Sequence, residues 1–221
     1  QMQYDRIFIL SDNHTHDQCV KSLLHIPALQ RALQMIVNAG EMTKSLDTAA
    51  SLWRKLKEEA ATRHSLLLSV GGGMITDLGG FVAAAFKRGM QCVHVSTSLL
   101  GAVDAATGAK TALNFEGCKN MIGFFYQPQH VIVATDFFNT LDAQQLLSGY
   151  AEMLKHALIS SKEDWIKTIA WDIETMPIDK KVDMNVNQRK VSKIIVLFVM
   201  IVLFQRYVLL NKVKKIVNIL V

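Results

Sequence analysis

A carboxylate, an ammonium group and an imidazole lie within one helical turn in the segment GYAEMLKHALI, residues 149–159. Glu152 and His156 are four residues apart, so on a helix both side chains share one face and could bind one metal ion. Lys155 could equally form a surface ion pair with Glu152, which is worth only about 0.3 kcal/mol. The spacing alone therefore predicts half of a metal or acid–base site, and the other half must come from elsewhere.

Three consecutive glycines, residues 71–73, lie between a short apolar run and a helical pattern. Free backbone N–H groups and the helix dipole favour a phosphate there, and glycine lets the backbone approach it closely. The run departs from the G-x-G-x-x-G fingerprint because Thr76 occupies its last position, so a tight turn without a ligand remains open. Asp77 is either a helix cap or a ligand acceptor. Gly79 and Gly80 each cost about 1 kcal/mol inside a helix, which indicates that another chain segment or a ligand packs against them.

A glycine-rich stretch, VDAATGAKTALNFEGCKNMIGFFYQP, carries several polar side chains and reads as mostly loop. Lysines in such a segment suit a phosphorylated substrate, and solvated surface lysines are the alternative. The polar residues are Asp104, Lys110, Asn114, Lys119 and Asn120.

The elements that position these residues alternate between strands and helices. The apolar strand segments have little polar alternation, which predicts an α/β fold with a parallel sheet covered on both faces. The predicted strands are residues 6–11, 33–40, 65–70 and 90–97. The predicted helices are residues 17–36, with a break at Pro27, 45–63, with Ser45 or Asp47 as its cap, and 76–89.

The pattern becomes purely helical after residue 140. Residues 141–161 place apolar side chains at helical spacing behind a cap at Asp142. We therefore expect an α/β domain at 1–140, the start of a helical domain at 141–183, and an atypical tail at 184–221.

The tail accounts for the net charge of +5. It holds seven basic and no acidic residues, which leaves 17 basic and 19 acidic groups in residues 1–183. The body of the chain therefore gives no reason to expect nucleic acid as a partner. The longest apolar run of the tail, residues 194–204, is 11 residues long. A membrane-spanning helix needs about 20, so no membrane partner is expected.

The cysteines Cys19, Cys92 and Cys118 show no CxxC spacing and no signal peptide opens the chain. Both features predict reduced thiols in a cytoplasmic protein.

Taken together, the stretch SVGGGMITDLGGFVAAAFKRGMQCVHVSTSLLGAVDAATGAKTALNFEGCKNMIGFFYQP and the later LLSGYAEMLKHALIS resemble 3-dehydroquinate synthase of the shikimate pathway. The resemblance runs from about residue 5 to about residue 180 and implies an NAD-binding α/β domain facing a helical, metal-binding domain, usually in a homodimer. It also implies a lyase that converts 3-deoxy-D-arabino-heptulosonate 7-phosphate to 3-dehydroquinate. NAD transiently oxidises the C5 hydroxyl so that phosphate is eliminated, and zinc (or cobalt) acts as a Lewis acid.

The resemblance also assigns roles to individual residues. Asp12, Glu41 and Lys44 are expected on the adenosine side of NAD, Arg88 is expected to reach the partner subunit's substrate phosphate, and Glu152 is the expected zinc ligand. The other expected NAD contacts are Gly72, Gly73, Met74, Ile75, Thr76, Asp77, Thr97, Ser98, Leu100, Lys110, Lys119, Phe137, Phe138, Asn139, Thr140 and Leu141. The expected substrate and catalytic residues are Asp104, Lys110, Asn120, Lys155 and Glu152.

Several positions depart from the family pattern. Ser96 stands in place of a proline, Ala109 in place of a glycine and Gln145 in place of an acidic residue near the cofactor. The family's other two zinc ligands are histidines in runs resembling GHTxGHA and HG, but no histidine follows His156. A catalytic zinc ion needs three protein ligands, so we expect an incomplete site and a chain that binds NAD without turnover.

Two explanations of the tail and two alternative functions stay open. A shifted reading frame near residues 184–196 is one explanation of the tail, and a genuine hydrophobic extension is the other. A related NAD- and metal-dependent synthase or polyol dehydrogenase is the alternative enzyme. A non-catalytic fragment with a hydrophobic association tail is the alternative outside enzymes.

Overall fold

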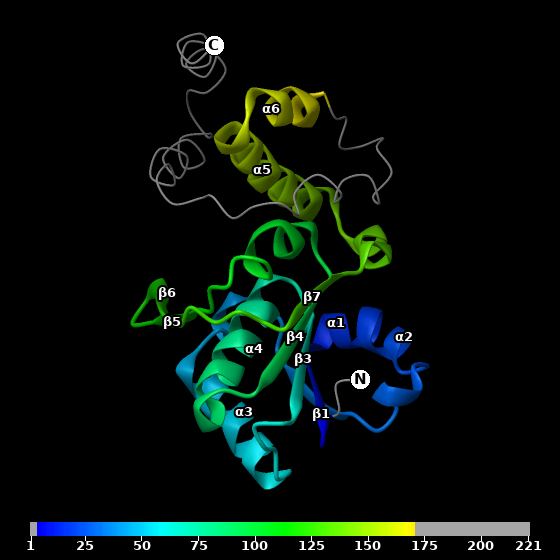
Figure 1. Cartoon of the computed structure of the whole chain (residues 1–221), viewed down its shortest axis with the longest axis vertical. Coiled ribbons are helices and arrows are strands. Elements are labelled where there is room, and N and C mark those ends of the chain that lie inside the picture. Colours follow the sequence, from blue (N-terminus) through cyan, green and yellow to red (C-terminus); the bar gives the residue numbers. More distant parts are fainter. Residues whose placement is uncertain (1–3, 171–221) are drawn as a thin grey trace. The chain divides into compact units, whose positions relative to one another are not determined.

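The computed structural model describes residues 4–170 (Figure 1). Among these, the residues up to Glu152 form one compact unit, and residues 153–170 belong to a second. The predicted tail at 184–221 and the end of the predicted domain at 141–183 lie outside the described residues.

The first unit is built on a five-stranded parallel sheet with the order β2-β1-β3-β4-β7. Its strands are β1 Ile7–Asp12, β2 Leu33–Val37, β3 Leu66–Gly71, β4 Gln91–Ser96 and β7 His130–Val133. All six residues of β3 are buried, as expected of a central strand covered on both faces. The predicted α/β fold and four predicted strands are confirmed, and β7 was not predicted.

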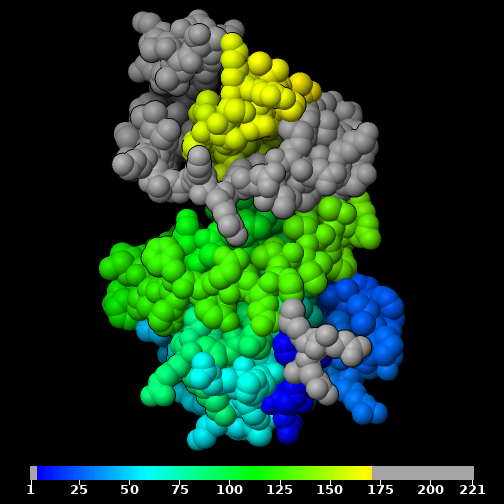
Figure 2. All heavy atoms as spheres, in the orientation of Figure 1, coloured from blue at the N-terminus to red at the C-terminus, as the bar shows by residue number. Residues whose placement is uncertain are grey.

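Two separate apolar cores cover the faces of this sheet. Helices α3 (Leu46–Glu58) and α4 (Gly73–Ala85) pack on one face around Phe8, Leu67 and Leu78. The segment that begins at Asn13 covers the other face, where Cys19 and Val20 are buried. Figures 1 and 2 show this blue segment and the cyan α3 on opposite flanks of the unit.

Helix α3 starts as predicted, because the Ser45 hydroxyl accepts a hydrogen bond from the Thr48 amide at 3.2 Å. Helix α4 starts at Gly73 and ends at Ala85, followed by a 3₁₀ turn at Phe86–Arg88, so it is displaced from the predicted 76–89.

The two glycines within α4 are explained by close packing. A Cβ on Gly79 would collide with the Ser69 hydroxyl of β3, and one on Gly80 would lie 2.7 Å from Cγ2 of Thr111. Neither contact leaves room for a methyl group, so α4 lies against the sheet at a distance that only glycine permits.

The predicted helix at residues 17–36 is confirmed only as far as Leu23. Helix α1 Asn13–Thr15, a π-helical turn at His16–Val20 and α2 Lys21–Leu23 form one uninterrupted helical run, which is followed by a 3₁₀ turn at Pro27–Leu29. Ile26 is extended, with ψ at 119°, because a residue before proline avoids the helical region. The chain then enters β2, where Leu33 pairs with Phe8 of β1.

The stretch at residues 103–128 is also more regular than predicted. After a π-helical turn at Gly101–Ala105, strands β5 (Leu113–Phe115) and β6 (Cys118–Ile122) form an antiparallel hairpin. Its two-residue turn, Glu116 and Gly117, has positive φ at both positions (48° and 77°), which suits a type I′ turn.

Further 3₁₀ turns lie at Glu41–Thr43 and Thr135–Thr140, and the remaining helices are α5 Ala143–Ser160 and α6 Lys162–Ile169. The predicted cap of α5 is confirmed, because Oδ1 of Asp142 accepts from the Gln145 amide at 2.8 Å. The Gln145 side chain accepts from the Asp142 amide in return, at 3.2 Å. None of the helices in residues 4–170 is long and apolar enough to cross a membrane.

Candidate functional site

The carboxyl ends of β1, β3 and β4 meet at one edge of the sheet. The chain leaves β1 toward β2 on one side and returns to β3 on the other, so strands β1 and β3 flank the point where the strand order reverses. Ligands of open parallel sheets bind in the crevice at this point. Asp12 ends β1 and Gly71 ends β3, which places both predicted segments at the crevice.

A cavity of about 460 Å³ occupies this position. Ten of the predicted NAD contacts line it, namely Asp12, Gly72, Gly73, Met74, Ile75, Thr97, Ser98, Leu100, Thr140 and Leu141. The sequence-based assignment missed others, including His14, Gln18, Cys19, Gly40 and Ser148, because no local motif marks them and only the fold brings them to the cavity. In the part of the chain that the structure describes, no lysine or arginine lines this cavity.

The amino end of α4 supplies the positive potential that the cavity otherwise lacks. Gly72 is the N-cap residue and provides no side-chain hydrogen bond to the helix. The first N–H groups of a helix of 13 residues therefore remain available to an anion. A Cβ on Gly72 would lie 3.1 Å from the Ser98 hydroxyl, so glycine keeps this approach open.

Asp12 shapes the neighbouring wall. Its carboxylate accepts a hydrogen bond from the Thr15 amide at 2.8 Å, and the Thr15 hydroxyl accepts one from the Asp12 amide at 3.1 Å. This reciprocal cap fixes the carboxylate at the end of β1, where it is 8% exposed.

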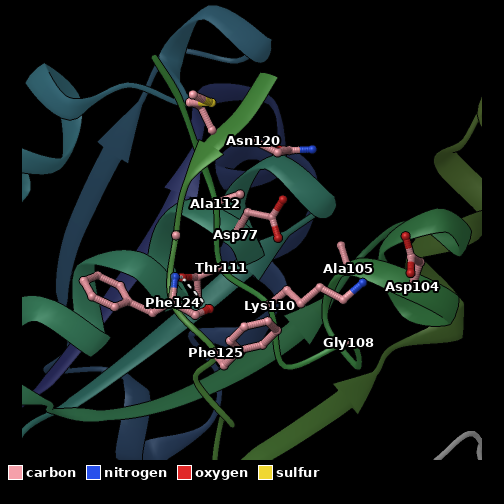
Figure 3. Close-up of a pocket in the computed structure, with 12 residues that line it drawn as sticks. Asp77, Asp104, Ala105, Gly108, Lys110, Thr111, Ala112, Asn120, Phe124 and Phe125 are labelled. Carbon is pink, nitrogen blue, oxygen red and sulfur yellow. Dashed lines mark hydrogen bonds between the residues drawn. The ribbon is translucent and has the colours of Figure 1, made fainter. Parts of the chain in front are cut away.

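A second cavity of about 470 Å³ has a different, more polar lining (Figure 3). Charged groups in this lining come from Asp77 of α4, Asp104 of the π-helical turn and Lys110. Asn120 of β6 contributes an amide. Phe124 and Phe125 add an apolar wall. Figure 3 shows Lys110 and Phe125 extending toward the side of Asp104, whereas the Phe124 ring points away to the other side of its strand. Such a mixture of donors and acceptors suits a small ligand rich in oxygen atoms.

Lys44 binds two residues that line this second cavity. The sequence-based assignment placed it on the adenosine side of NAD, yet its ammonium lies 2.5 Å from Oδ2 of Asp77 and 2.6 Å from Oδ1 of Asn120. Lys44 is 4% exposed. Asp77 therefore does not cap α4; it forms a largely buried ion pair.

Two opposing effects act on the pKa of the Asp77 carboxyl. Burial raises the pKa of its carboxyl, and the Lys44 ammonium lowers it. Asp104 and Glu41 add smaller effects that raise the pKa. Burial is the larger effect, so the pKa of Asp77 is raised overall, and Lys44 limits the rise.

The remaining predicted residues are placed as follows. Glu41 accepts a hydrogen bond from the Asn114 side chain at 2.9 Å, and Lys119 is exposed on β6. Thr76 is buried, where its hydroxyl donates to the Gly73 carbonyl. Phe137 packs in the core behind the sheet, Phe138 is fully buried and Asn139 is exposed. Arg88 is exposed and adopts a φ of +63°.

Glu152, Lys155 and His156 lie on α5. Glu152 ends the first unit, and a carboxylate oxygen of Asp104 lies within 4.8 Å of one of Glu152. Lys155 and His156 follow within one turn of the same helix, and His156 is buried. Two carboxylates from separate elements thus converge, and such oxygen donors fit a divalent cation.

Comparison with known proteins decides the family. Residues 34–148 match the family described as 3-dehydroquinate synthase N-terminal. The chain belongs to the 3-dehydroquinate synthase family. It is 47% identical over 175 residues to 3-dehydroquinate synthase of Parabacteroides distasonis, covering 79% of this chain and 50% of that protein. The enzyme of the same name from Bacillus cytotoxicus is 40% identical over 181 residues, covering 80% and 48%.

Solved structures agree with this family. A 2-deoxy-scyllo-inosose synthase complexed with carbaglucose-6-phosphate, NAD+ and Co2+ superposes with a TM-score of 0.65 at 28% identity, covering 71% of this chain and 43% of that one. A 2-epi-5-epi-valiolone synthase from Streptomyces hygroscopicus with NAD+ and Zn2+ bound gives 0.65 at 31%, covering 69% and 43%. The chain thus spans about half the length of these two curated relatives.

Proposed function

We propose that this chain carries the dinucleotide-binding half, and part of the substrate site, of a 3-dehydroquinate synthase. The observation that carries the proposal is the cavity at the carboxyl edge of the sheet, which combines the amino end of α4 with a buried acceptor, Asp12. NAD fits this lining, since its pyrophosphate would lie at the helix end and its ribose hydroxyls beside Asp12. The division into an NAD domain at 1–140 and a metal domain from 141 is part of this proposal.

The second cavity is proposed to hold the phosphorylated sugar acid. Lys110 and the Asn120 amide would donate to substrate oxygens, and Asp104 would lie between cofactor and substrate. NAD, when bound, would supply reversible hydride transfer with this substrate. Lys155 would bind substrate from the helical part, and Lys119 would contact the cofactor from the hairpin.

Glu152 is the proposed metal ligand, and the neighbouring Asp104 carboxylate suits the same cation. His156, one turn after Glu152, is the one histidine of the chain beyond residue 130. When bound, zinc or cobalt would supply Lewis acidity in this family. Because no further histidine follows in these 221 residues, we propose that the chain as it stands does not complete the reaction.

We further propose a cytoplasmic homodimer in which Arg88 reaches the partner's ligand. Lys87 and Arg88 are both exposed and both have positive φ (50° and 63°). Two consecutive left-handed residues are costly, and such strain concentrates at functional segments.

A related sugar phosphate cyclase is the second candidate, supported by the solved structures at 28–31% identity. The relatives at 40–47% identity, all named 3-dehydroquinate synthase, favour the first candidate. Likeness to a glycerol dehydrogenase at 17% identity supports the fold alone.

The test is a calorimetric titration of the whole chain with NAD, followed by a phosphate-release assay. We expect saturable binding of one NAD per chain and no phosphate released from the heptulosonate phosphate in the presence of NAD and zinc. Absence of NAD binding would contradict the proposed function, and measurable phosphate release would contradict the proposed loss of turnover.

A further inference from the structure

Asn114 joins two segments that border different cavities. Its amide donates to the Lys44 carbonyl at 2.9 Å, and its side-chain nitrogen donates to the Glu41 carboxylate at 2.9 Å. Its side-chain oxygen accepts from the Asn120 amide at 3.0 Å. Both ends of the carboxamide are therefore used, one on the 41–44 segment and one on hairpin β5–β6.

The bond to Asn120 has a consequence for that residue. Asn120 has a φ of +54°, a left-handed conformation in which asparagine is enriched over other residues that carry a Cβ. Asn114 supports it at the backbone, and Lys44 holds its side-chain oxygen at 2.6 Å.

Lys44 also determines which way the Asn120 carboxamide faces. An ammonium group only donates, so the oxygen of the carboxamide must face Lys44. The NH₂ group is then left for the second cavity, which Asn120 lines, and Figure 3 shows the amide nitrogen outermost. The carboxamide can therefore donate to a ligand oxygen without first reorienting.

The 40–44 segment also borders the first cavity. Gly40, which lines it, directly precedes Glu41, and its carbonyl accepts from the Thr43 amide at 3.1 Å. At one end, the 40–44 segment thus borders the first cavity, the proposed NAD site, which we call the nucleotide-type cavity. At its other end, Lys44 binds Asp77 and Asn120.

We propose that Asn114 is a positioning residue that makes the 40–44 segment and hairpin β5–β6 one unit. A dinucleotide bound beside Gly40 then stabilises Asn120 as a donor for an oxygen-rich anionic ligand in the second cavity. Asn114 touches neither ligand in this account and acts through Lys44, Glu41 and Asn120. The dinucleotide rests on the proposed function; the linkage between the two segments does not.

The test is hydrogen–deuterium exchange of the whole chain, with and without saturating NAD. In the wild type, NAD is expected to slow exchange at 113–122 at least threefold. Asn114→Ala is expected to speed exchange of both 41–44 and 113–122 in the free protein and to abolish the NAD effect on the hairpin. Its affinity for NAD should change less than threefold, because the residue is outside the nucleotide-type cavity.

Two further variants separate positioning from general loosening. Asn114→Asp keeps the acceptor for the Asn120 amide but sets a carboxylate against Glu41, so exchange should rise at 41–44 more than at the hairpin. Adding Glu41→Gln restores a donor–acceptor pair and is expected to reverse that rise. Ser22→Ala, which removes one local hydrogen bond to the Cys19 carbonyl, is the matched control and should leave both segments unchanged.

The linkage is overturned if Asn114→Ala speeds exchange in the hairpin alone, or if NAD still slows the hairpin in that variant. If the wild type binds no NAD, the proposed function fails. The free-protein exchange of Asn114→Ala against Ser22→Ala then decides the linkage by itself.

Discussion

Lys44 Nζ lies 2.5 Å from Oδ2 of Asp77, and both side chains are largely buried although 33 residues separate them in sequence. The pair ties the segment after β2 to the second turn of α4. It also places the Asp77 carboxyl, whose pKa burial raises, beside an ammonium that limits the rise.

Removing the charge of Lys44 should therefore destabilise the protein through Asp77. We expect Lys44→Met to lower the free energy of unfolding by about 3 kcal/mol, since it leaves a buried carboxylate without its partner. The loss should shrink as the pH is lowered and Asp77, whose pKa is already raised, takes up a proton. Urea unfolding at several pH values measures both effects.

The double variant Lys44→Met/Asp77→Asn is the control for that mechanism. It removes both charges and should recover most of the lost stability. Equal destabilisation of the single and double variants would show that packing, and not charge, is what Lys44 contributes.

His94 should make stability fall in mild acid. Burial lowers the pKa of His94 to about 4, from 6.5 in an unfolded chain, so between these values the unfolded state binds more protons. Stability should fall by up to about 3 kcal/mol as the pH drops from 6.5 to 4, at 1.36 kcal/mol per unit. Comparing the pH slopes of wild type, His94→Gln and the exposed-site variant His64→Gln isolates the effect. Only His94→Gln should have the flatter slope.

The family resemblance implies a glycine at the position of Ala109, whose φ of +52° suits glycine. Ala109→Gly should raise the free energy of unfolding by about 0.5–1 kcal/mol, because the left-handed conformation costs alanine more than the added chain entropy costs glycine. Ala106→Gly is the matched control, since Ala106 has an ordinary helical φ of −69° and should lose stability. Thermal unfolding of both variants checks the opposite signs.

The nucleotide-type cavity should discriminate between NAD and NADP. Its lining includes Asp12 and, within residues 4–170, neither lysine nor arginine. A 2′-phosphate would bring extra negative charge to this wall with no cation to meet it. We expect NADP to bind at least tenfold more weakly than NAD in paired titrations. Equal affinities would place the ribose away from Asp12.

Sequence reasoning predicted the features that depend on local patterns. The apolar runs predicted four of the five strands, and the motifs at their ends located Asp12, Gly72 and Thr97 beside the first cavity. The hairpin was missed because Glu-Gly is a less obvious turn pair than Asn-Gly.

The contacts of Lys44 and Asn114 were missed for a different reason. Asn120 is 76 residues from Lys44, and Asn114 is 73 residues from Glu41. Only the arrangement of β2, α4 and the hairpin in the fold brings these residues together, and no spacing within a short stretch of sequence predicts it. The predicted helix at 17–36 was too long because apolar residues beyond Pro27 keep a helical period, whereas the chain is extended before the proline and enters β2 after it.

The most direct test of the account is an NAD titration of the wild-type chain beside Gly73→Val and Ser51→Val. A Cβ at Gly73 lies 3.2 Å from that of Ala105, so a larger side chain would crowd the entrance to α4, whereas Ser51 is exposed on α3. We predict that the wild type and Ser51→Val bind NAD equally and that Gly73→Val binds at least tenfold more weakly. Equal binding by all three chains, or binding by none, would contradict a dinucleotide site at the amino end of α4.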